Sequence, residues 1–265
     1  MDLESAKSSL LYSAEYTLVC LAIGIVVYLL SRALKLQYQG WAFPRPKQAA
    51  IFGLASVSVS MLLSSMLLLI GSRGGQSSTS PRVHYNLNAV VNYALLYLLL
   101  AGPVLIVMHK RKEPWASAGI SRHNLTGSLV VGLLIVGSLL AARAFFAPGG
   151  VTTFITRLNA DHFWASLCFA VVGFAEEFLF RGYLQARLIA WLGKWQGWLL
   201  TSILMAMVHI TQRIAVMGLS PMEAIISSAL LIPVNLLLGY MMLRTDNVIG
   251  PALLHIYADW INTLS

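Results

Sequence analysis

Charged residues and cysteines are scarce in this chain of 265 residues. Only 11% of the residues are Asp, Glu, Lys or Arg, and the two cysteines, Cys20 and Cys168, lie in apolar stretches without metal-ligand spacing. This composition excludes a disulfide-stapled secreted module and an intrinsically disordered chain. The formal net charge is +8, but no run of basic residues is longer than Lys110, Arg111 and Lys112. We therefore expect no nucleic-acid partner.

Apolar residues dominate instead: 58% of the chain is hydrophobic and the mean hydropathy is +0.74. A helix needs about 20 apolar residues to cross the hydrocarbon core of a bilayer. Eight segments of roughly that length predict an all-α membrane protein, a bundle of about eight transmembrane helices around a polar intramembrane cavity. The predicted spans are Tyr16–Leu34, Ala49–Ile70, Ala89–Met108, Leu125–Phe146, Phe163–Phe180, Trp198–Val216, Ala224–Leu243 and Val248–Leu264.

The basic residues are distributed unevenly between the loops. The first, third, fifth and seventh loops hold most of them, and the third loop, with its Lys110–Lys112 run and Arg122, is among the richest. The positive-inside rule places these loops in the cytoplasm and both termini on the opposite side. We therefore expect a multi-pass protein integral to the lipid bilayer.

Five ionisable residues lie deep within the predicted spans, where an isolated charge is costly. They are Glu176, Glu177, His209, His255 and Asp259. With a rise of about 1.5 Å per residue, Glu176 lies about 9 Å, His255 about 10 Å and His209 about 18 Å from the inner boundary. Such groups are satisfied only by one another or by water, so we expect residues 176, 209 and 255 to meet around a wet pocket. His255 and Asp259 are four residues apart and share one helix face.

Glu177 and Arg181 are also four residues apart, with the acid N-terminal to the base, which favours an ion pair on one helix face. A structural role is the simpler interpretation of that pair. Glu176 is turned by about 100° from Glu177 and lacks such a local partner. Gly173, one turn before Glu176, is expected to leave room beside its carboxylate for water or a substrate backbone.

A carboxylate and an imidazole in a low-dielectric site can together deprotonate a water molecule and make it a nucleophile. Peptide hydrolysis also needs donors for the developing oxyanion, which a second polar pair on another helix can supply. Zinc bound by the same His and Glu residues is the alternative. However, the sequence has no H-E-x-x-H motif, and a catalytic zinc needs three well-placed ligands. We therefore expect no metal cofactor.

The C-terminal half resembles the CAAX protease and bacteriocin-processing (CPBP, or Abi) family of intramembrane proteases, including CAAX prenyl protease type 2-like members. The run from Glu176 to Gly182 is similar to the EExxxR motif of that family, Ser202 to His209 is similar to FxxxH, and Gly239 to Asp259 is similar to HxxxN. The resemblance covers about Ala160 to the end. It implies a catalytic four-helix core in residues 160–265, after an N-terminal four-helix membrane region in residues 1–159.

The resemblance further implies an endopeptidase that cleaves a membrane-associated protein or peptide near its C-terminus, with or without a prenyl group. By motif, Glu176 and His209 would activate the water, while His255 and the residue at 259 would stabilise the oxyanion. Glu177 and Arg181 would order the first of these helices. The family was long classed with the metalloendopeptidases, but the resemblance implies a glutamate-type, metal-free mechanism.

Two positions depart from the family motifs. Met205 replaces Phe in the second motif, a change of side chain that a packed helix tolerates. Asp259 replaces the Asn that is typical of CAAX enzymes, and an ionised carboxylate cannot donate to an oxyanion. We expect Asp259 to orient His255, although a protonated Asp259 or a metal-bound one remains an alternative.

The departure at Asp259 favours a bacterial branch of the family, with substrates other than farnesylated CAAX tails and a location in a prokaryotic inner or plasma membrane. We expect the active site in the cytoplasmic half of that membrane.

Two other functions fit the same buried acids and histidines. One is a proton-coupled transporter, although Pro103 and Pro233 interrupt two spans without any repeated half. The other is a catalytically silent immunity or scaffold protein, against which the intact Glu176, His209 and His255 argue.

Overall fold

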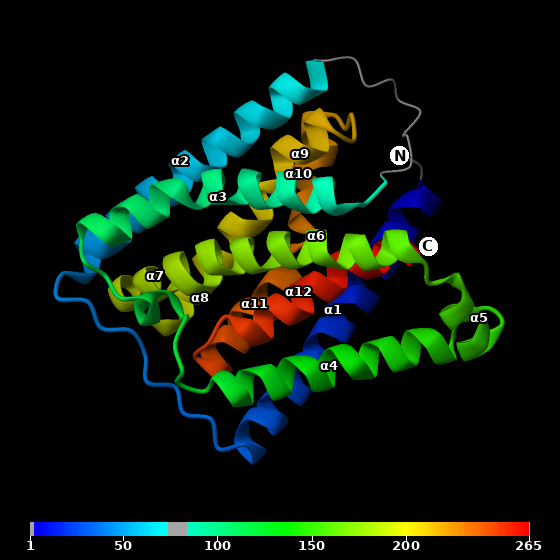
Figure 1. Ribbon diagram of the computed structural model, residues 1–265, viewed down its shortest axis with the longest axis horizontal. Helices are drawn as coiled ribbons and strands as arrows, with labels where there is room; N and C mark the ends of the chain where they lie inside the picture. The colour runs from blue at the N-terminus through cyan, green and yellow to red at the C-terminus, as the bar shows by residue number, and fades with distance from the viewer. Residues whose placement is uncertain (1–2, 74–83, 265) are drawn as a thin grey trace.

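The protein is an all-helical bundle (Figure 1). The computed structural model describes residues 3–73 and 84–264, and the side chains among them except those of 3–12 and 72–73; within these ranges there is no β-strand. The α-helices are α1 (Leu3–Ala33), α2 (Pro46–Arg73), α3 (Leu87–Lys110), α4 (Leu125–Phe145), α5 (Gly150–Arg157), α6 (Ala160–Glu177), α7 (Ala186–Leu192), α8 (Lys194–Met207), α9 (His209–Ala215), α10 (Pro221–Ala229), α11 (Ile232–Thr245) and α12 (Ile249–Trp260). Two short 3₁₀ helices, η1 (Trp115–Ala118) and η3 (Ile261–Leu264), and a π-helix, η2 (Phe178–Gln185), complete the order.

Seven helical stretches in the described residues are long and apolar enough to cross a membrane, which confirms the all-α membrane bundle. They correspond to the first seven predicted spans. Their bounds are Ser13–Ala33, Pro46–Gly71, Leu87–Lys110, Leu125–Phe145, Ala160–Leu192, Lys194–Ala215 and Pro221–Thr245.

The eighth predicted span is shorter than expected, because α12 has only 12 residues and η3 adds 4. It nevertheless runs antiparallel to α6 (Figure 1). At its start, Val248 lies against Gly182, where an added Cβ would be 2.9 Å from the Val248 side chain. At its other end, the Trp260 indole donates to the carbonyl of His162 at 2.8 Å, and the His162 ring bonds the carbonyl of Thr263 at 3.2 Å. The predicted number of eight transmembrane helices is therefore approximate, because the last segment is shorter than a full span.

Three of the long stretches are not continuous α-helices. The fifth becomes the π-helix η2 directly after Glu177, the sixth breaks between α8 and α9 at Val208, and the seventh breaks between α10 and α11. π-Helical segments within α-helices are rare and occur frequently at functional sites. Two of the three irregularities directly adjoin residues of the predicted site, Glu177 and His209.

The loops that follow α1, α3 and α11 meet at one end of the bundle (Figure 1). The backbone N–H of Gln39 donates to Asp246 Oδ2 at 3.2 Å, and the Asn124 amide donates to the carbonyl of Gln37 at 2.8 Å. These are three of the basic loops that the positive-inside rule assigns to the cytoplasm. Their hydrogen bonds place them on the same side as one another.

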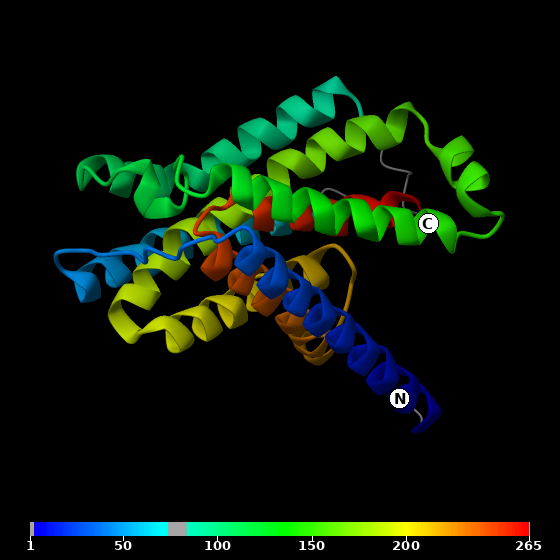
Figure 2. The same cartoon turned by 90° about the horizontal axis from the view of Figure 1, so that it is seen from below.

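Helices from both parts of the chain pack together. In Figure 2, α1 crosses beside α11, and α4 runs beside α12. Helix α3 packs along α6, and α2 packs against α7. The expected boundary between residues 159 and 160 falls just before α6. The N-terminal helices pack against the helices that carry the motifs.

Candidate active site

Helix α6 presents its two glutamates at its last two positions. Asn159 caps the N-terminus by accepting the His162 N–H at 3.2 Å, while the His162 ring accepts the N–H of Asn159 at 3.2 Å. The cap satisfies N–H groups that have no partner within the helix and fixes where α6 begins. Glu176 and Glu177 therefore lie at the junction of a well-started α-helix and the π-helix η2.

Gly173 allows α6 and α12 to approach closely. A Cβ at this position would lie 2.8 Å from Ile256 Cγ1 and 3.2 Å from the Ile256 backbone nitrogen. The expectation that Gly173 leaves space for water or substrate is therefore wrong, because helix α12 fills that space. The close approach brings His255 of α12 next to the glutamates of α6.

One half of the site is sealed from solvent and built on Glu177. The side chains of Glu177 and Arg181 are fully buried and form the expected ion pair, with Arg181 Nη1 2.9 Å from Glu177 Oε1. The same Oε1 accepts a hydrogen bond from His255 Nδ1 at 2.7 Å. Arg181 also donates to the side-chain oxygen of the buried Asn235 in α11. Glu177 thus fixes the orientation of the His255 ring as well as neutralising Arg181.

The other half is partly accessible and built on Glu176. Its side chain is 20% exposed, and its Oε2 lies 3.7 Å from His255 Nε2. Asp259 Oδ2 lies 3.5 Å from the same nitrogen, with its side chain 34% exposed. The second oxygen of Glu176, Oε1, accepts a hydrogen bond from the Tyr97 hydroxyl at 2.9 Å. His255 Nε2 therefore faces two carboxylates at distances at which one water molecule can bond to all three groups.

His209 is held differently from the other predicted site residues. It is the first residue of α9, directly after the break, and its Nδ1 donates to the carbonyl of Met205 at 2.9 Å. This bond leaves Nε2 of the neutral ring as an acceptor. His209 interacts electrostatically with Asp259, but among the described residues no hydrogen bond or ion pair joins it to Glu176 or His255. The structure thus brings 176 and 255 together and leaves 209 at the edge of the cluster.

Two residues that touch this cluster were missed by the sequence reasoning, Tyr97 and Asn235. Asn235 joins three helices, since its side chain accepts from Arg181, its amide donates to Leu231 O at 2.8 Å and its carbonyl accepts from Ser202 at 3.1 Å. A buried amide within an apolar span was a usable signal, because such groups require partners. Tyr97 carried no comparable signal.

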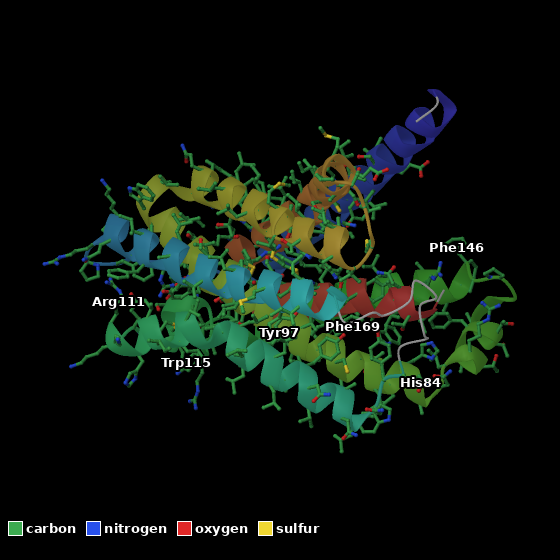
Figure 3. All side chains as sticks on the ribbon, turned by 90° about the horizontal axis from the view of Figure 1, so that it is seen from above. His84, Tyr97, Arg111, Trp115, Phe146 and Phe169 are labelled. Atoms are coloured by element: carbon green, nitrogen blue, oxygen red, sulfur yellow. The ribbon has the colours of Figure 1, made fainter. Side chains whose placement is uncertain are left out.

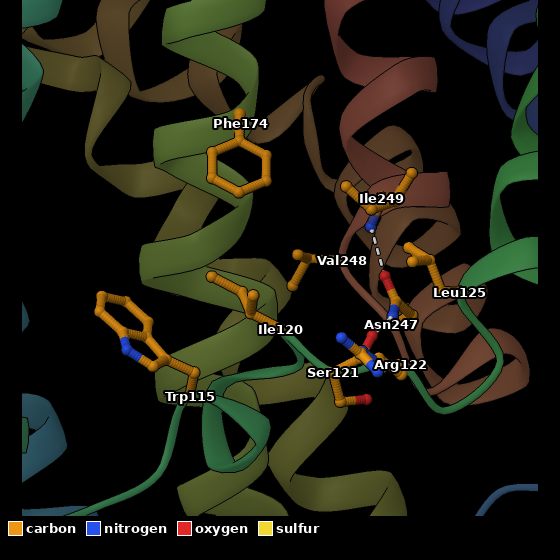
Figure 4. Close-up of a pocket in the computed structure, with 9 residues that line it drawn as sticks. All are labelled: Trp115, Ile120, Ser121, Arg122, Leu125, Phe174, Asn247, Val248 and Ile249. Carbon is orange, nitrogen blue, oxygen red and sulfur yellow. Dashed lines mark hydrogen bonds between the residues drawn. The ribbon is translucent and has the colours of Figure 1, made fainter.

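An apolar pocket of about 420 Å³ lies beside the helices that carry the cluster (Figure 4). Phe174 of α6 and Ile249 of α12 line it, together with Trp115 and Ile120 from the loop after α3. Arg122 also lines the pocket. The pocket lies toward the end of the bundle at which the basic loops meet. It provides space for an apolar group next to the helices that bear the acids and the histidine.

The donor geometry does not favour a metal site. Among residues 3–73 and 84–264, no three His, Cys, Asp or Glu side chains are arranged to hold a metal ion. The nearest candidates are Glu176, His255 and Asp259, whose closest atoms are 3.5 and 3.7 Å apart. Glu177 accepts from the other ring nitrogen of His255. The described residues therefore do not offer the three arranged ligands that a catalytic zinc needs.

A multi-pass helical bundle with a partly accessible carboxylate–imidazole cluster offers the groups that a membrane-embedded hydrolase needs. Residues 157–261 match a family model described as type II CAAX prenyl endopeptidase Rce1-like. This match to part of the chain supports a CAAX-type protease activity in the membrane. No curated protein and no solved structure matched the chain. None of these findings favours the transporter or the immunity and scaffold alternatives.

Proposed function

We propose that the protein is a glutamate-type intramembrane endopeptidase that cleaves a membrane-associated protein or peptide near its C-terminus. The observation that carries the proposal is the division of the cluster into two halves. The sealed Glu177 fixes the His255 ring, while Glu176 and Asp259 face its other nitrogen from an accessible side. A site that only stabilised the fold would have no reason to leave its second carboxylate open to water.

Glu176 is the general base of the proposed reaction. It accepts a proton from a water molecule held between its Oε2 and His255 Nε2, and the resulting hydroxide attacks the peptide carbonyl carbon. The protonated His255, held by Glu177, donates to the oxyanion that forms. The tetrahedral intermediate then collapses, the C–N bond breaks, and the leaving nitrogen takes the proton that Glu176 accepted.

Two further residues assist this reaction in the proposal. Asp259 accepts from His255 and keeps the ring protonated and aligned, which is the orienting role expected when Asp replaces Asn. His209 has a free Nε2 lone pair and supports Glu176 as a second acceptor once substrate is bound, because catalytic hydrogen bonds tighten in the substrate complex.

The apolar pocket supports a substrate with an apolar group that binds beside α6 and α12. Its walls include Phe174, three residues before the end of α6, and Ile249 at the start of α12. A prenylated or otherwise lipid-like tail is the substrate feature that such a pocket fits. We place the site in the cytoplasmic half of the membrane, because the pocket opens near the basic loops.

The test is cleavage of a membrane-anchored reporter peptide by the purified protein in detergent or in vesicles. Glu176→Gln keeps the size of the side chain but removes the base, so we expect kcat to fall by about 10²- to 10⁴-fold. Glu15→Gln changes an exposed acid in α1 and is the matched control, for which we expect unchanged turnover. Wild-type turnover in Glu176→Gln would refute the assignment.

A chelator added to the same assay separates the metal-free mechanism from the zinc alternative. We expect activity to persist in chelator, because the proposed base acts directly on water. Loss of activity that added zinc restores would show metal coordination instead.

A further inference from the structure

Tyr97 is the only described side chain that forms a hydrogen bond with Glu176. It belongs to α3, which lies outside the matched residues 157–261. Its hydroxyl donates to Glu176 Oε1 at 2.9 Å. Glu177 differs sharply, because two partners, His255 and Arg181, already hold one of its oxygens. The orientation of the Glu176 carboxylate therefore depends on a helix from the other part of the chain.

The contact is set by the packing of α3 along α6. On one side of it, the rings of Tyr85 and Phe169 pack 5.9 Å apart, and on the other side the rings of Trp115 and Phe178 pack 6.0 Å apart. Figure 3 shows Tyr97 between Trp115 and Phe169 along this seam. Tyr85 precedes α3, Trp115 follows it in η1 and Phe178 begins η2, so the two pairs hold the segments at both ends of the α3–α6 contact. The hydroxyl of Tyr97 is consequently placed by the fold and not by a flexible loop.

The hydrogen bond also fixes the plane of the Glu176 carboxylate, with one oxygen on Tyr97 and the other facing His255. The terminal torsion of a glutamate is broad, so the plane of a carboxylate without a partner varies widely. With Oε1 held by Tyr97, Oε2 points toward His255 Nε2, 3.7 Å away. Oε2 is the oxygen that would accept the proton of the attacking water. Loss of the hydroxyl would release the base from this alignment, and misalignment of a base lowers the rate of the chemical step.

We infer that Tyr97 is a positioning residue that holds Glu176 in its reactive orientation, so that the N-terminal helices complete the proteolytic site. The inference rests on the proposed function. It predicts an effect on kcat, since the bond aligns the base, and little effect on KM, since Tyr97 Oη is engaged with Glu176 and not with substrate.

The test compares Tyr97→Phe with Tyr93→Phe in the reporter assay. Tyr93 lies one turn earlier in α3 and is half-buried like Tyr97, so its variant matches the loss of one hydroxyl from the same helix. A hydrogen bond to a charged group corresponds to roughly a 10- to 100-fold effect. We expect Tyr97→Phe to lose that factor in kcat with KM within about twofold of wild type, and Tyr93→Phe to retain wild-type values. Kinetics are normalised to folded, monodisperse protein, which removes any contribution from reduced stability.

The outcomes separate the inference from the function on which it rests. Wild-type kcat in Tyr97→Phe, with Glu176→Gln inactive, would overturn the positioning role and leave the protease intact. A raised KM with unchanged kcat would also overturn it, since that pattern marks a substrate contact. Full activity in Glu176→Gln would overturn the protease proposal itself, and the role of Tyr97 with it.

Discussion

Substitution of Glu177 tests two roles of this residue: the stability that it gives as the partner of Arg181, and the orientation of His255 for catalysis. The carboxylate is fully buried between Arg181 and His255. Glu177→Met replaces it with an apolar side chain of similar volume and leaves the buried Arg181 guanidinium without its counter-ion. Breaking a buried ion pair in this way costs about 3–5 kcal/mol. For a chain of this size that corresponds to a fall in melting temperature on the order of 10 °C.

The double variant Glu177→Met/Arg181→Met removes both charges at once. Replacing a buried pair by apolar residues of similar volume is often neutral, so we expect most of the lost melting temperature to return. Activity should not return, because His255 Nδ1 still lacks the carboxylate that orients its ring. Thermal unfolding in detergent gives the stability of each variant, and the reporter assay on the same preparations gives kcat.

Two results would refute this reasoning. Recovery of wild-type kcat in the double variant would show that Glu177 acts only through Arg181, as the simple structural interpretation holds. A double variant as unstable as Glu177→Met would show that the cost lies in packing around η2 and not in an uncompensated charge.

Three further predictions follow from other parts of the molecule. Gly173→Ala should reduce both stability and kcat, because its Cβ would lie 2.8 Å from the facing helix α12. Gly137→Ala, whose Cβ would have nothing within 4 Å, should instead gain up to about 1 kcal/mol of stability from helix propensity. Unfolding and turnover measurements distinguish the two variants, and equal behaviour would contradict the close approach of α6 and α12. Burial raises the pKa of Asp246, so the folded state binds a proton there more tightly than the unfolded state, and the stability of the protein falls as pH rises through that pKa. Asp246→Asn should therefore unfold at a higher temperature than wild type near pH 7, with the difference in melting temperature shrinking on acidification. A difference in melting temperature that grows in acid would contradict this direction. A membrane-impermeant thiol reagent applied to intact cells should label Arg157→Cys but not Arg45→Cys, because the two positions are predicted on opposite faces of the membrane. Both positions are exposed and both native cysteines are buried, so labelling reports the introduced cysteine. The reverse pattern would invert the predicted orientation.

The membrane fold could be predicted from the sequence because apolar length and composition decide it. Seven predicted spans became helical stretches of the required length, and the Glu177–Arg181 pair follows from helical spacing alone. The breaks within three spans could not be predicted, because they depend on packing between helices. Packing between helices also explains the error at Gly173, because the space expected beside it is filled by α12. The eighth segment is shorter than the count of apolar residues indicates.

The site was only partly predictable, because spacing describes one helix at a time. It indicated that His255 and Asp259 share a face, but not that Glu177 reaches His255 from a different helix. That contact depends on how α6 and α12 rotate about their axes. Tyr97 illustrates the limit further, since an aromatic residue in an apolar span has the same pattern whether it faces lipid or a carboxylate.

The fastening of η3 has a practical consequence for handling the protein. Trp260, directly after Asp259, and Thr263, one turn beyond Asp259, both contact His162 near the start of α6. A fusion partner or affinity tag joined close behind Leu264 would lie next to these contacts, and so next to the part of α12 that carries the imidazole. An inactive preparation tagged there should be compared with one tagged before α1, whose start lies apart from η3 in Figure 2.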